Sequence, residues 1–233
     1  MTVAAVILSA TPEGALRAID GRPLVRRLAE AAWSGGGVPV VVVAADPDGA
    51  VAAALAGAQV TLAEPAPREA GPVAQICRGI DVARGLVTET EAAIVWPARL
   101  AWVDPETLTS LIEAHGTDPE PVIRPAFEGT PGWPVLLPVA HLEALRALRP
   151  DRMPDELLDD LAAAGVPFRT LEVGDPGTTH DLATEREDLP PYAGPPEPAS
   201  GHAHEWGSMA AETADDAPLP GPTVAPWEPA PGR

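Results

Sequence analysis

The sequence predicts an α/β fold of three layers, in which helices cover both faces of a mostly parallel central sheet. Short apolar runs without polar alternation, such as Val3 to Leu8 and Val38 to Ala44, are typical of parallel strands buried on both faces. Segments with helical spacing of apolar residues separate these runs. This β-α-β-α-β order specifies a parallel sheet with right-handed crossovers.

The first half of the chain supplies most of that pattern. After the first strand comes a loop broken by proline and glycine, then a tight Asp20-Gly21 turn and a helix from Arg22 to Trp33. Three consecutive glycines end this helix, because glycine adopts the backbone conformations that follow a helix. The next predicted elements are a strand at 38–44, a helix at 50–56, a strand at 60–62, a helix at 72–86 and a strand at 92–96.

The second half begins with a well-marked helix start. Asp104, Pro105 and Glu106 indicate an N-cap, a proline in the first turn and an acidic residue near the positive end of the helix dipole. We expect this helix to extend to about His115. The remaining predictions are strands at 122–124 and 134–137, helices at 140–148 and 155–164, and a strand at 168–173.

The composition changes at Pro190. Residues 190–233 contain 11 prolines, six acidic residues and one arginine. Too few apolar side chains remain there to offset the entropy lost when a chain is ordered. The sequence therefore predicts an α/β domain over residues 1–189, followed by a proline-rich acidic disordered tail over residues 190–233.

The composition also limits the kinds of partner that the protein is expected to bind. The 34 acidic and 15 basic residues give a net charge of -19, and every basic residue is an arginine. Such a field repels phosphate backbones, so we expect no binding to nucleic acid or to a membrane. The sequence has no basic leader and no apolar run of about 18 residues, which predicts a cytoplasmic protein. The single cysteine, Cys77, excludes an internal disulfide and is expected to be a buried structural thiol.

Four phrases occur in a recognisable order: DGRPL from Asp20, DPETL from Asp104, RPAFEGTPGWPVL from Arg124 and DPGTTHDLAT from Asp175. Over residues 3–189 they resemble the MobA-like NTP transferase family, and most closely its molybdenum cofactor cytidylyltransferases. The resemblance implies a Rossmann-like nucleotidyltransferase fold and transfer of a nucleotidyl group from an NTP to an acceptor phosphate. It also implies a magnesium ion at the α-phosphate, held by carboxylates.

The nucleotide-binding site that the resemblance locates lacks several of the family's residues in this sequence. The family's first loop grips the triphosphate with glycines, an arginine and a lysine. Here that loop is shorter, Thr11 replaces a glycine, Glu13 adds a negative charge, and lysine is absent from the chain. By position, the candidate nucleotide-binding residues are Leu8, Ser9, Ala10, Arg17 and Arg99.

The metal site shows a second loss. Counting back from Asp104, the position of the family's metal aspartate falls at Arg99, which is either a surface residue or a fixed cation in place of magnesium. The later phrase keeps Asp181, our metal candidate, but has Ala183 at the second carboxylate position. Asp181 is either a surviving ligand or the cap of a short helix. Three tryptophans nearby are expected to be buried, with base stacking as the alternative for the first two: Trp96, Trp102 and Trp133.

These losses predict a family member with impaired catalysis, because removing one such electrostatic group typically costs ~10²–10³ in rate. Such a protein binds a nucleotide or a molybdopterin-type ligand without a cofactor, or assists a partner protein. The alternative is an active magnesium-dependent nucleotidyltransferase in which Arg17 and Arg99 hold the phosphates. In that case Asp175, Asp181 or Glu185 holds the metal. A third possibility is a scaffold whose acidic tail binds a basic protein.

Overall fold

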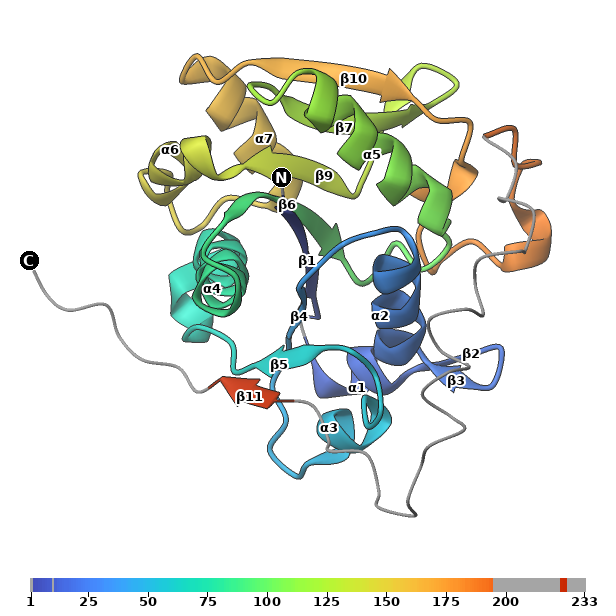
Figure 1. The fold of residues 1–233 in the computed structure, drawn as a ribbon. Helices are drawn as coiled ribbons and strands as arrows, with labels where there is room; N and C mark the ends of the chain where they lie inside the picture. Colours follow the sequence, from blue (N-terminus) through green and yellow to red (C-terminus); the bar gives the residue numbers. More distant parts are fainter. Residues whose placement is uncertain (1, 10, 195–222, 226–233) are drawn as a thin grey trace, which may run out of the picture.

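The computed structural model describes residues 2–9, 11–194 and 223–225 (Figure 1). A main sheet and a small hairpin contain the strands. Those of the main sheet are β1 (Thr2–Leu8), β4 (Val40–Val43), β5 (Thr61–Ala63), β6 (Thr90–Pro97), β7 (Val122–Phe127), β8 (Thr130–Pro131), β9 (Val135–Pro138), β10 (Phe168–Glu172) and β11 (Thr223–Ala225). The hairpin consists of β2 (Ala18–Ile19) and β3 (Arg22–Pro23).

Within the described residues the main sheet has the order β10-β7-β9-β6-β1-β4-β5-β11, and β8 pairs with β7. Neighbouring strands are parallel except at β9, which is antiparallel to both β6 and β7, and at β8. The strands β6, β1, β4 and β5 form the parallel centre. This arrangement confirms the predicted fold: a mostly parallel sheet of the Rossmann-like nucleotidyltransferase type.

Helices pack on both faces of the sheet (Figure 1). They are α1 (Pro12–Leu16), α2 (Leu24–Ser34), α3 (Ala50–Ala54), α4 (Gly71–Leu86), α5 (Pro105–Thr117), α6 (Leu142–Arg146) and α7 (Pro154–Ala163). Short 3-10 turns occupy Arg68–Ala70, Val139–His141, Pro176–Thr178 and Arg186–Asp188. Both α2 and α4 contact β1 and β4, from opposite sides, while α5 packs beside β7.

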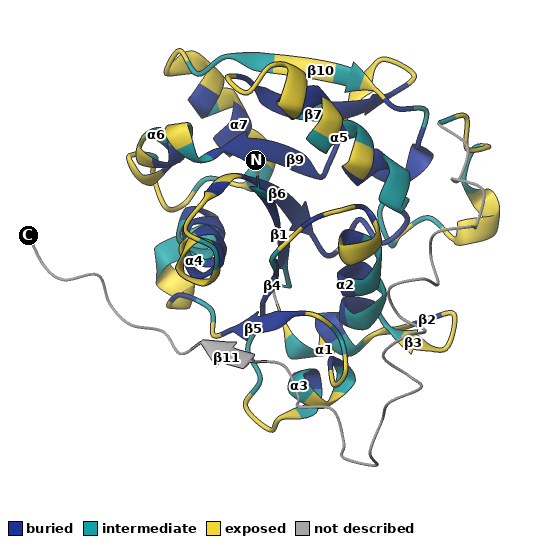
Figure 2. Cartoon of the chain, in the orientation of Figure 1, coloured by how far each residue is buried: buried dark blue, intermediate teal, exposed yellow. Residues whose placement is uncertain are grey.

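The core lies where α2 and α4 enclose the central strands. Residues 4–7 of β1 have no exposed surface, and all of β4 is buried. Figure 2 shows this continuous buried centre and the exposed outer faces of the helices. Cys77 lies in α4 and is buried, and this burial raises the pKa of its thiol to about 11. The predicted structural thiol is confirmed.

Most predicted elements occur within a few residues of their expected bounds. The Asp20-Gly21 turn is confirmed: both residues have positive φ, 50° and 75°, as a two-residue hairpin turn requires. The short strands β2, β3 and β8 were not predicted, and residues 22–23 form β3 instead of the start of the predicted helix. Two further elements were also missed. The loop after β1 contains the short helix α1, and β11 pairs in parallel with β5 inside the segment predicted to be a tail.

The rest of the predicted disordered tail lies outside the described residues, apart from residues 190–194. Ala193 donates a hydrogen bond to the carbonyl of Gly174 there, with 2.8 Å between N and O. Of the helices in the described ranges, none combines the length and the apolar character needed to cross a membrane.

Candidate functional site

The carboxyl ends of β1, β4 and β6 meet at one edge of the sheet, where open α/β folds bind ligands. Leu8 ends β1 and its carbonyl accepts a hydrogen bond from the N–H of Ala98, at 2.9 Å. The N–H of Ser9 donates to the carbonyl of Val43, at 3.0 Å. Two of the candidate binding residues are therefore fixed between the neighbouring strands. Ala10, the third, lies outside the described residues.

Several hydrogen-bond donors of the first loop bond to Thr11 in the same loop. Thr11 is the N-cap of α1, and its Oγ1 accepts from the N–H of Gly14 at 3.0 Å. The carbonyl of Thr11 accepts from the N–H of Ala15 at 3.0 Å and from Ser9 Oγ at 3.1 Å. Pro12 begins the helix and has no N–H to donate. Phosphate-binding loops need free backbone N–H groups, and those of Ser9, Gly14 and Ala15 are already bonded.

Arg17 follows α1 and stands apart from the other candidates. Its carbonyl accepts from the N–H of Leu24 at 2.8 Å, which fixes the backbone at the start of α2. The side chain is exposed, and its guanidinium makes no hydrogen bond or ion pair with another described residue. The structure leaves this arginine available to an anion without giving it a place in a defined pocket.

Arg99 and Asp181 come together, as two candidates from distant parts of the chain. Arg99 Nη1 lies 3.5 Å from Asp181 Oδ2, and the side chains are 48% and 39% exposed. A backbone bond joins the two segments, since the N–H of Leu182 donates to the carbonyl of Arg99 at 3.0 Å. The other oxygen of Asp181 accepts from the N–H of Ala183 at 2.9 Å. Asp181 thus caps its own turn and faces a guanidinium.

The contacts of Arg99 extend to a residue that the sequence did not single out. Arg99 Nη2 lies 3.8 Å from Asp155 Oδ2, in the first turn of α7. The other oxygen, Asp155 Oδ1, accepts from Trp133 Nε1 at 2.8 Å and lies 3.8 Å from Arg124 Nη2. Arg124 was part of a matched phrase, and a charged residue within an otherwise apolar strand was the available signal. No sequence signal pointed to Asp155, because acidic residues are common in the first turn of a helix.

A buried carboxylate corrects one prediction about α5. Asp104 stands at the N-cap position, but its side chain makes no capping bond. Asp175 holds the start of the helix from another loop: it accepts from the N–H of Asp104 at 3.0 Å, Thr107 Oγ1 at 2.7 Å and the N–H of Gly177 at 2.8 Å. Burial raises the pKa of Asp175, and burial together with the charge of Asp175 raises the pKa of Asp104 to about 6. With its oxygens bonded in this way, Asp175 is a structural group.

The three tryptophans are buried, as expected. Trp96 has no exposed surface and donates from Nε1 to the carbonyl of Leu100 at 2.8 Å. Trp102 donates from Nε1 to the carbonyl of Thr184 at 3.0 Å, and the Arg27 guanidinium covers its ring, 5.7 Å from the centroid. Neither ring presents an open face for a nucleotide base.

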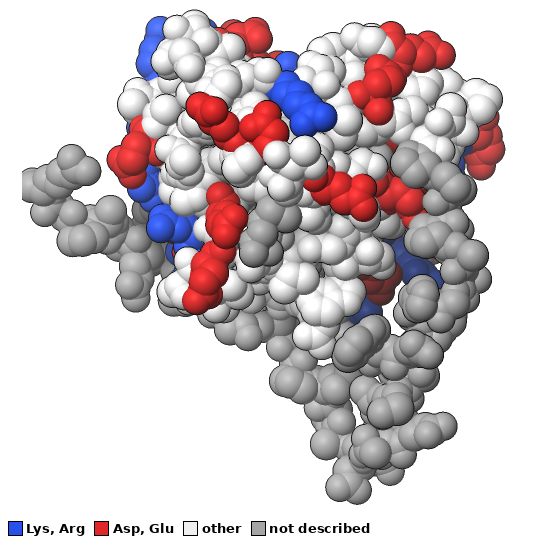
Figure 3. Space-filling model, turned by 45° about the horizontal axis from the view of Figure 1, so that its top comes forward, with Lys and Arg blue, Asp and Glu red and all other residues white. Residues whose placement is uncertain are grey.

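The residues at this edge do not fit a magnesium ion. Mg²⁺ is bound through carboxylates, phosphates and water in near-octahedral geometry. The described residues include no group of three or more His, Cys, Asp or Glu side chains placed to hold a metal. Asp181 and Asp155 both face Arg99, whose positive charge opposes the approach of a cation. The face in Figure 3 shows acidic side chains spread over the surface and basic ones in small separate groups.

The mostly parallel sheet with helices around it is the fold of the nucleotidyltransferase class. More particularly, the chain belongs to the MobA-like NTP transferase domain family, whose profile matches residues 13–165. No curated protein matches the sequence.

Solved structures share the fold at low identity. A Methanothermobacter nucleotidyl transferase is 19% identical, with a TM-score of 0.61 over 73% of this chain and 87% of its own. The 2-C-methyl-D-erythritol 4-phosphate cytidylyltransferase of Thermus thermophilus is 19% identical, with a TM-score of 0.57 over 81% and 96%. The Mycobacterium tuberculosis protein Rv0371c in complex with manganese is 17% identical, with a TM-score of 0.57 over 74% and 89%. These likenesses establish the fold.

Proposed function

We propose that this chain is an NTP-transferase-family protein that has lost metal-dependent nucleotidyl transfer and binds a nucleotide without a metal ion. A molybdopterin-type ligand is the second candidate for the same site, and either would suit an accessory to a partner protein. The observation that carries the proposal is the ion pair between Arg99 and Asp181, 3.5 Å apart. We place the protein in the cytoplasm, as its composition predicts.

The physical reason lies in what a guanidinium can and cannot do. It binds two phosphate oxygens in a planar fork and supplies one positive charge. It does not provide the octahedral coordination of a divalent cation, which neutralises the charge that develops at the α-phosphate. Binding would therefore persist at the carboxyl edge while the transfer step loses its main electrostatic support.

Calorimetry with CTP, GTP and ATP, in excess EDTA and in excess magnesium, tests this directly. We expect at least one nucleotide to bind equally well in both conditions, with no pyrophosphate released when an acceptor phosphate is added. Arg99→Ala should weaken that binding at least about tenfold, since a charge-assisted bidentate contact is lost. Arg169→Ala, at an exposed position on β10, is the matched control.

The alternative is an active enzyme with a remodelled metal site. Binding that requires magnesium, together with pyrophosphate release, would establish that alternative and refute the proposal. Asp175 is a poor ligand in that case because its oxygens are occupied by three donors. A remodelled site would have to recruit Asp181 or Glu185.

A further inference from the structure

Three donor groups converge on the carboxylate of Asp155. Trp133 Nε1 donates to its Oδ1 at 2.8 Å, Arg124 Nη2 lies 3.8 Å from the same oxygen, and Arg99 Nη2 lies 3.8 Å from Oδ2. The donors come from β7, from the residues before β9 and from the loop after β6, so tertiary folding alone assembles them.

The donors are better buried than the acceptor that they surround. Trp133 is 3% exposed and the Arg124 side chain 19%, whereas the Asp155 side chain is 63% exposed. Arg124 Nε is buried and has no hydrogen-bond partner among the described residues. Both guanidinium distances to Asp155 exceed hydrogen-bonding range. The carboxylate therefore satisfies the indole but leaves Arg124 short of an acceptor, which is costly for a buried donor. Arg99 is more exposed and is also paired with Asp181, 3.5 Å away.

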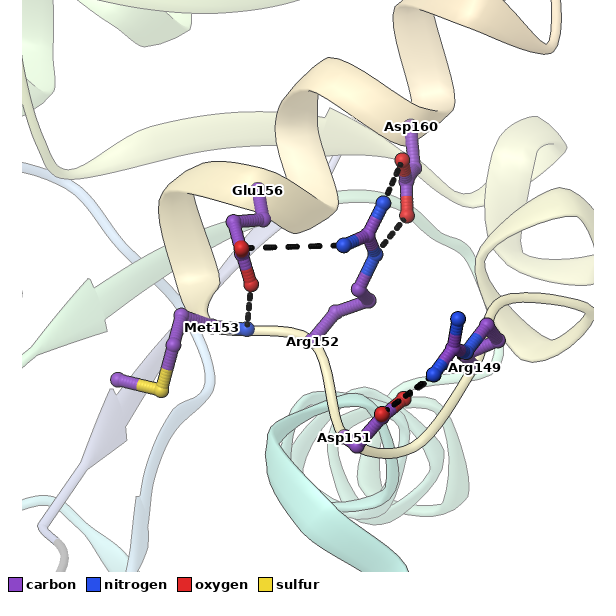
Figure 4. Close-up of polar contacts among 6 residues, drawn as sticks. All are labelled: Arg149, Asp151, Arg152, Met153, Glu156 and Asp160. Atoms are coloured by element: carbon purple, nitrogen blue, oxygen red, sulfur yellow. Dashed lines mark hydrogen bonds and ion pairs between the residues drawn. The ribbon is translucent and has the colours of Figure 1, made fainter.

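Contacts of residues next to Asp155 hold the start of α7 (Figure 4). Glu156 accepts a hydrogen bond from the N–H of Met153 at 3.0 Å, closing the start of α7. Arg152 makes two bonds to Asp160, at 2.5 and 2.8 Å. The Asp155 side chain can therefore rotate outward while the first turn of the helix stays in place. That turn also presents the positive end of a helix dipole to whatever replaces the carboxylate.

We propose that Arg124, Arg99 and Trp133 form a binding site for the phosphate group of a small ligand, and that Asp155 occupies this site in the free protein. A phosphate offers more acceptor oxygens than a carboxylate and can reach both guanidinium groups at once. On binding, it displaces the exposed Asp155 side chain into solvent. Asp155 then acts as an internal competitor that sets the affinity. This inference rests on the proposed function, since it identifies where a phosphorylated ligand is held.

Calorimetry on the full chain with inorganic phosphate and with pyrophosphate, in EDTA, tests the site. Asp155→Asn keeps the size of the side chain and removes its charge, so we expect phosphate affinity to rise at least about tenfold over wild type. Asp159→Asn is the matched control: it makes the same charge change at an exposed position of the same helix. Equal affinities in the two variants would overturn the proposal.

A second pair of variants tests the donors. We expect the gain in phosphate affinity to be lost when Asp155→Asn is combined with Trp133→Phe or with Arg124→Gln. Circular dichroism must show that each double variant is folded. Trp133→Phe removes the indole N–H and keeps an aromatic ring at this buried position, so it still tests the site if the arginine variant does not fold. A gain that persists in the folded double variants would overturn the proposal.

Titrations with a nucleotide and its fragments distinguish this site from the proposed function. With CTP, ribose 5-phosphate and cytidine as ligands, we expect Asp155→Asn to strengthen the two phosphorylated ligands and leave cytidine unchanged. Metal-free CTP binding that is the same in wild type, Asp155→Asn and Arg124→Gln would overturn this site and leave the proposed function standing. Absence of CTP binding to the wild type would count against the proposed function, while the phosphate measurement still decides on the site.

Discussion

The guanidinium of Arg99 faces the carboxylate of Asp181 across two loops, with 3.5 Å between Nη1 and Oδ2. Both side chains are well exposed, and exposed ion pairs of this kind contribute about 0–1 kcal/mol to stability. The pair is therefore a weak contributor to the fold. Its main effect is to place a positive charge where the family resemblance assigns a metal ligand.

Replacing Arg99 by aspartate should create a divalent-cation site. The variant would bring a third carboxylate near Asp155 and Asp181 and remove the opposing charge. We expect Mn²⁺ to bind with a Kd on the order of 10⁻⁴–10⁻³ M, as in weak oxygen-ligand sites, detected by electron paramagnetic resonance. Arg169→Asp, with the same charge change on β10, controls for net charge. Equal binding by both variants would show that the position is not special.

Ionisation of Asp104 should lower stability. Its pKa is raised to about 6 in the folded protein, first by burial and then by Asp175, against an ordinary value of 3.8. The folded state therefore binds more protons between about pH 4 and pH 6, and its stability falls as pH rises through that window. Asp104→Asn should be more stable than wild type at pH 7, because it removes the charge that burial disfavours. We expect a gain of about 1 kcal/mol, since solvent partly screens the Asp104 carboxylate. Urea unfolding measures this, with Glu113→Gln as the control on the same helix.

His115 should make the fold sensitive to acid in the opposite sense. It is 1% exposed, and neither ring nitrogen has a hydrogen-bond partner in the part of the chain that the structure describes. Burial lowers its pKa despite the nearby Glu91 and Asp118. The unfolded chain therefore takes up the proton first, and stability is lost as pH falls below about 6.5.

His115→Phe should remove this dependence of stability on pH. The free energy of unfolding of the variant, compared with that of wild type, should therefore increase by about 1 kcal/mol when the pH is lowered from 7 to 5. Denaturant melts at the two pH values give that difference, and His141→Gln is the control. A difference that does not change with pH would contradict the prediction.

Cys77 should resist thiol reagents in the folded protein. With a pKa of about 11, only about one thousandth of the thiol is ionised at pH 8, and the side chain is buried as well. We expect labelling by an aromatic disulfide to be at least about 10²-fold slower than in urea-unfolded protein. Fast labelling of the native chain would show that α4 opens readily.

The sequence predicted the parallel sheet and its helices because local patterns determine them: β1 is uniformly apolar, and α2 repeats apolar residues at helical spacing. It missed α1 because proline and glycine were taken as loop residues, whereas Thr11 caps the helix and Pro12 fits its first turn. The predicted side-chain cap by Asp104 is absent, and the contacts of Asp175 could not be predicted, since only folding brings residue 175 to the start of α5.

The candidate site was predictable only in part. Motif positions pointed to Arg99 and Asp181, which the structure brings into contact. They did not point to Asp155 or to its contacts with Arg124 and Trp133, because Asp155 comes from a separate element and no spacing relates it to their phrase. The roles of Arg17 and of the residues around Ser9 stay predictions.

The pairing of β11 with β5 has a consequence for any shortened form of the protein. Residues 223–225 run parallel to 61–63 and cover the outer hydrogen-bonding groups of β5, which otherwise ends the sheet (Figure 1). An uncovered edge strand is a template for another chain. Removing residues 190–233 would therefore expose that template and favour self-association, so truncation would change the oligomeric state along with any partner binding.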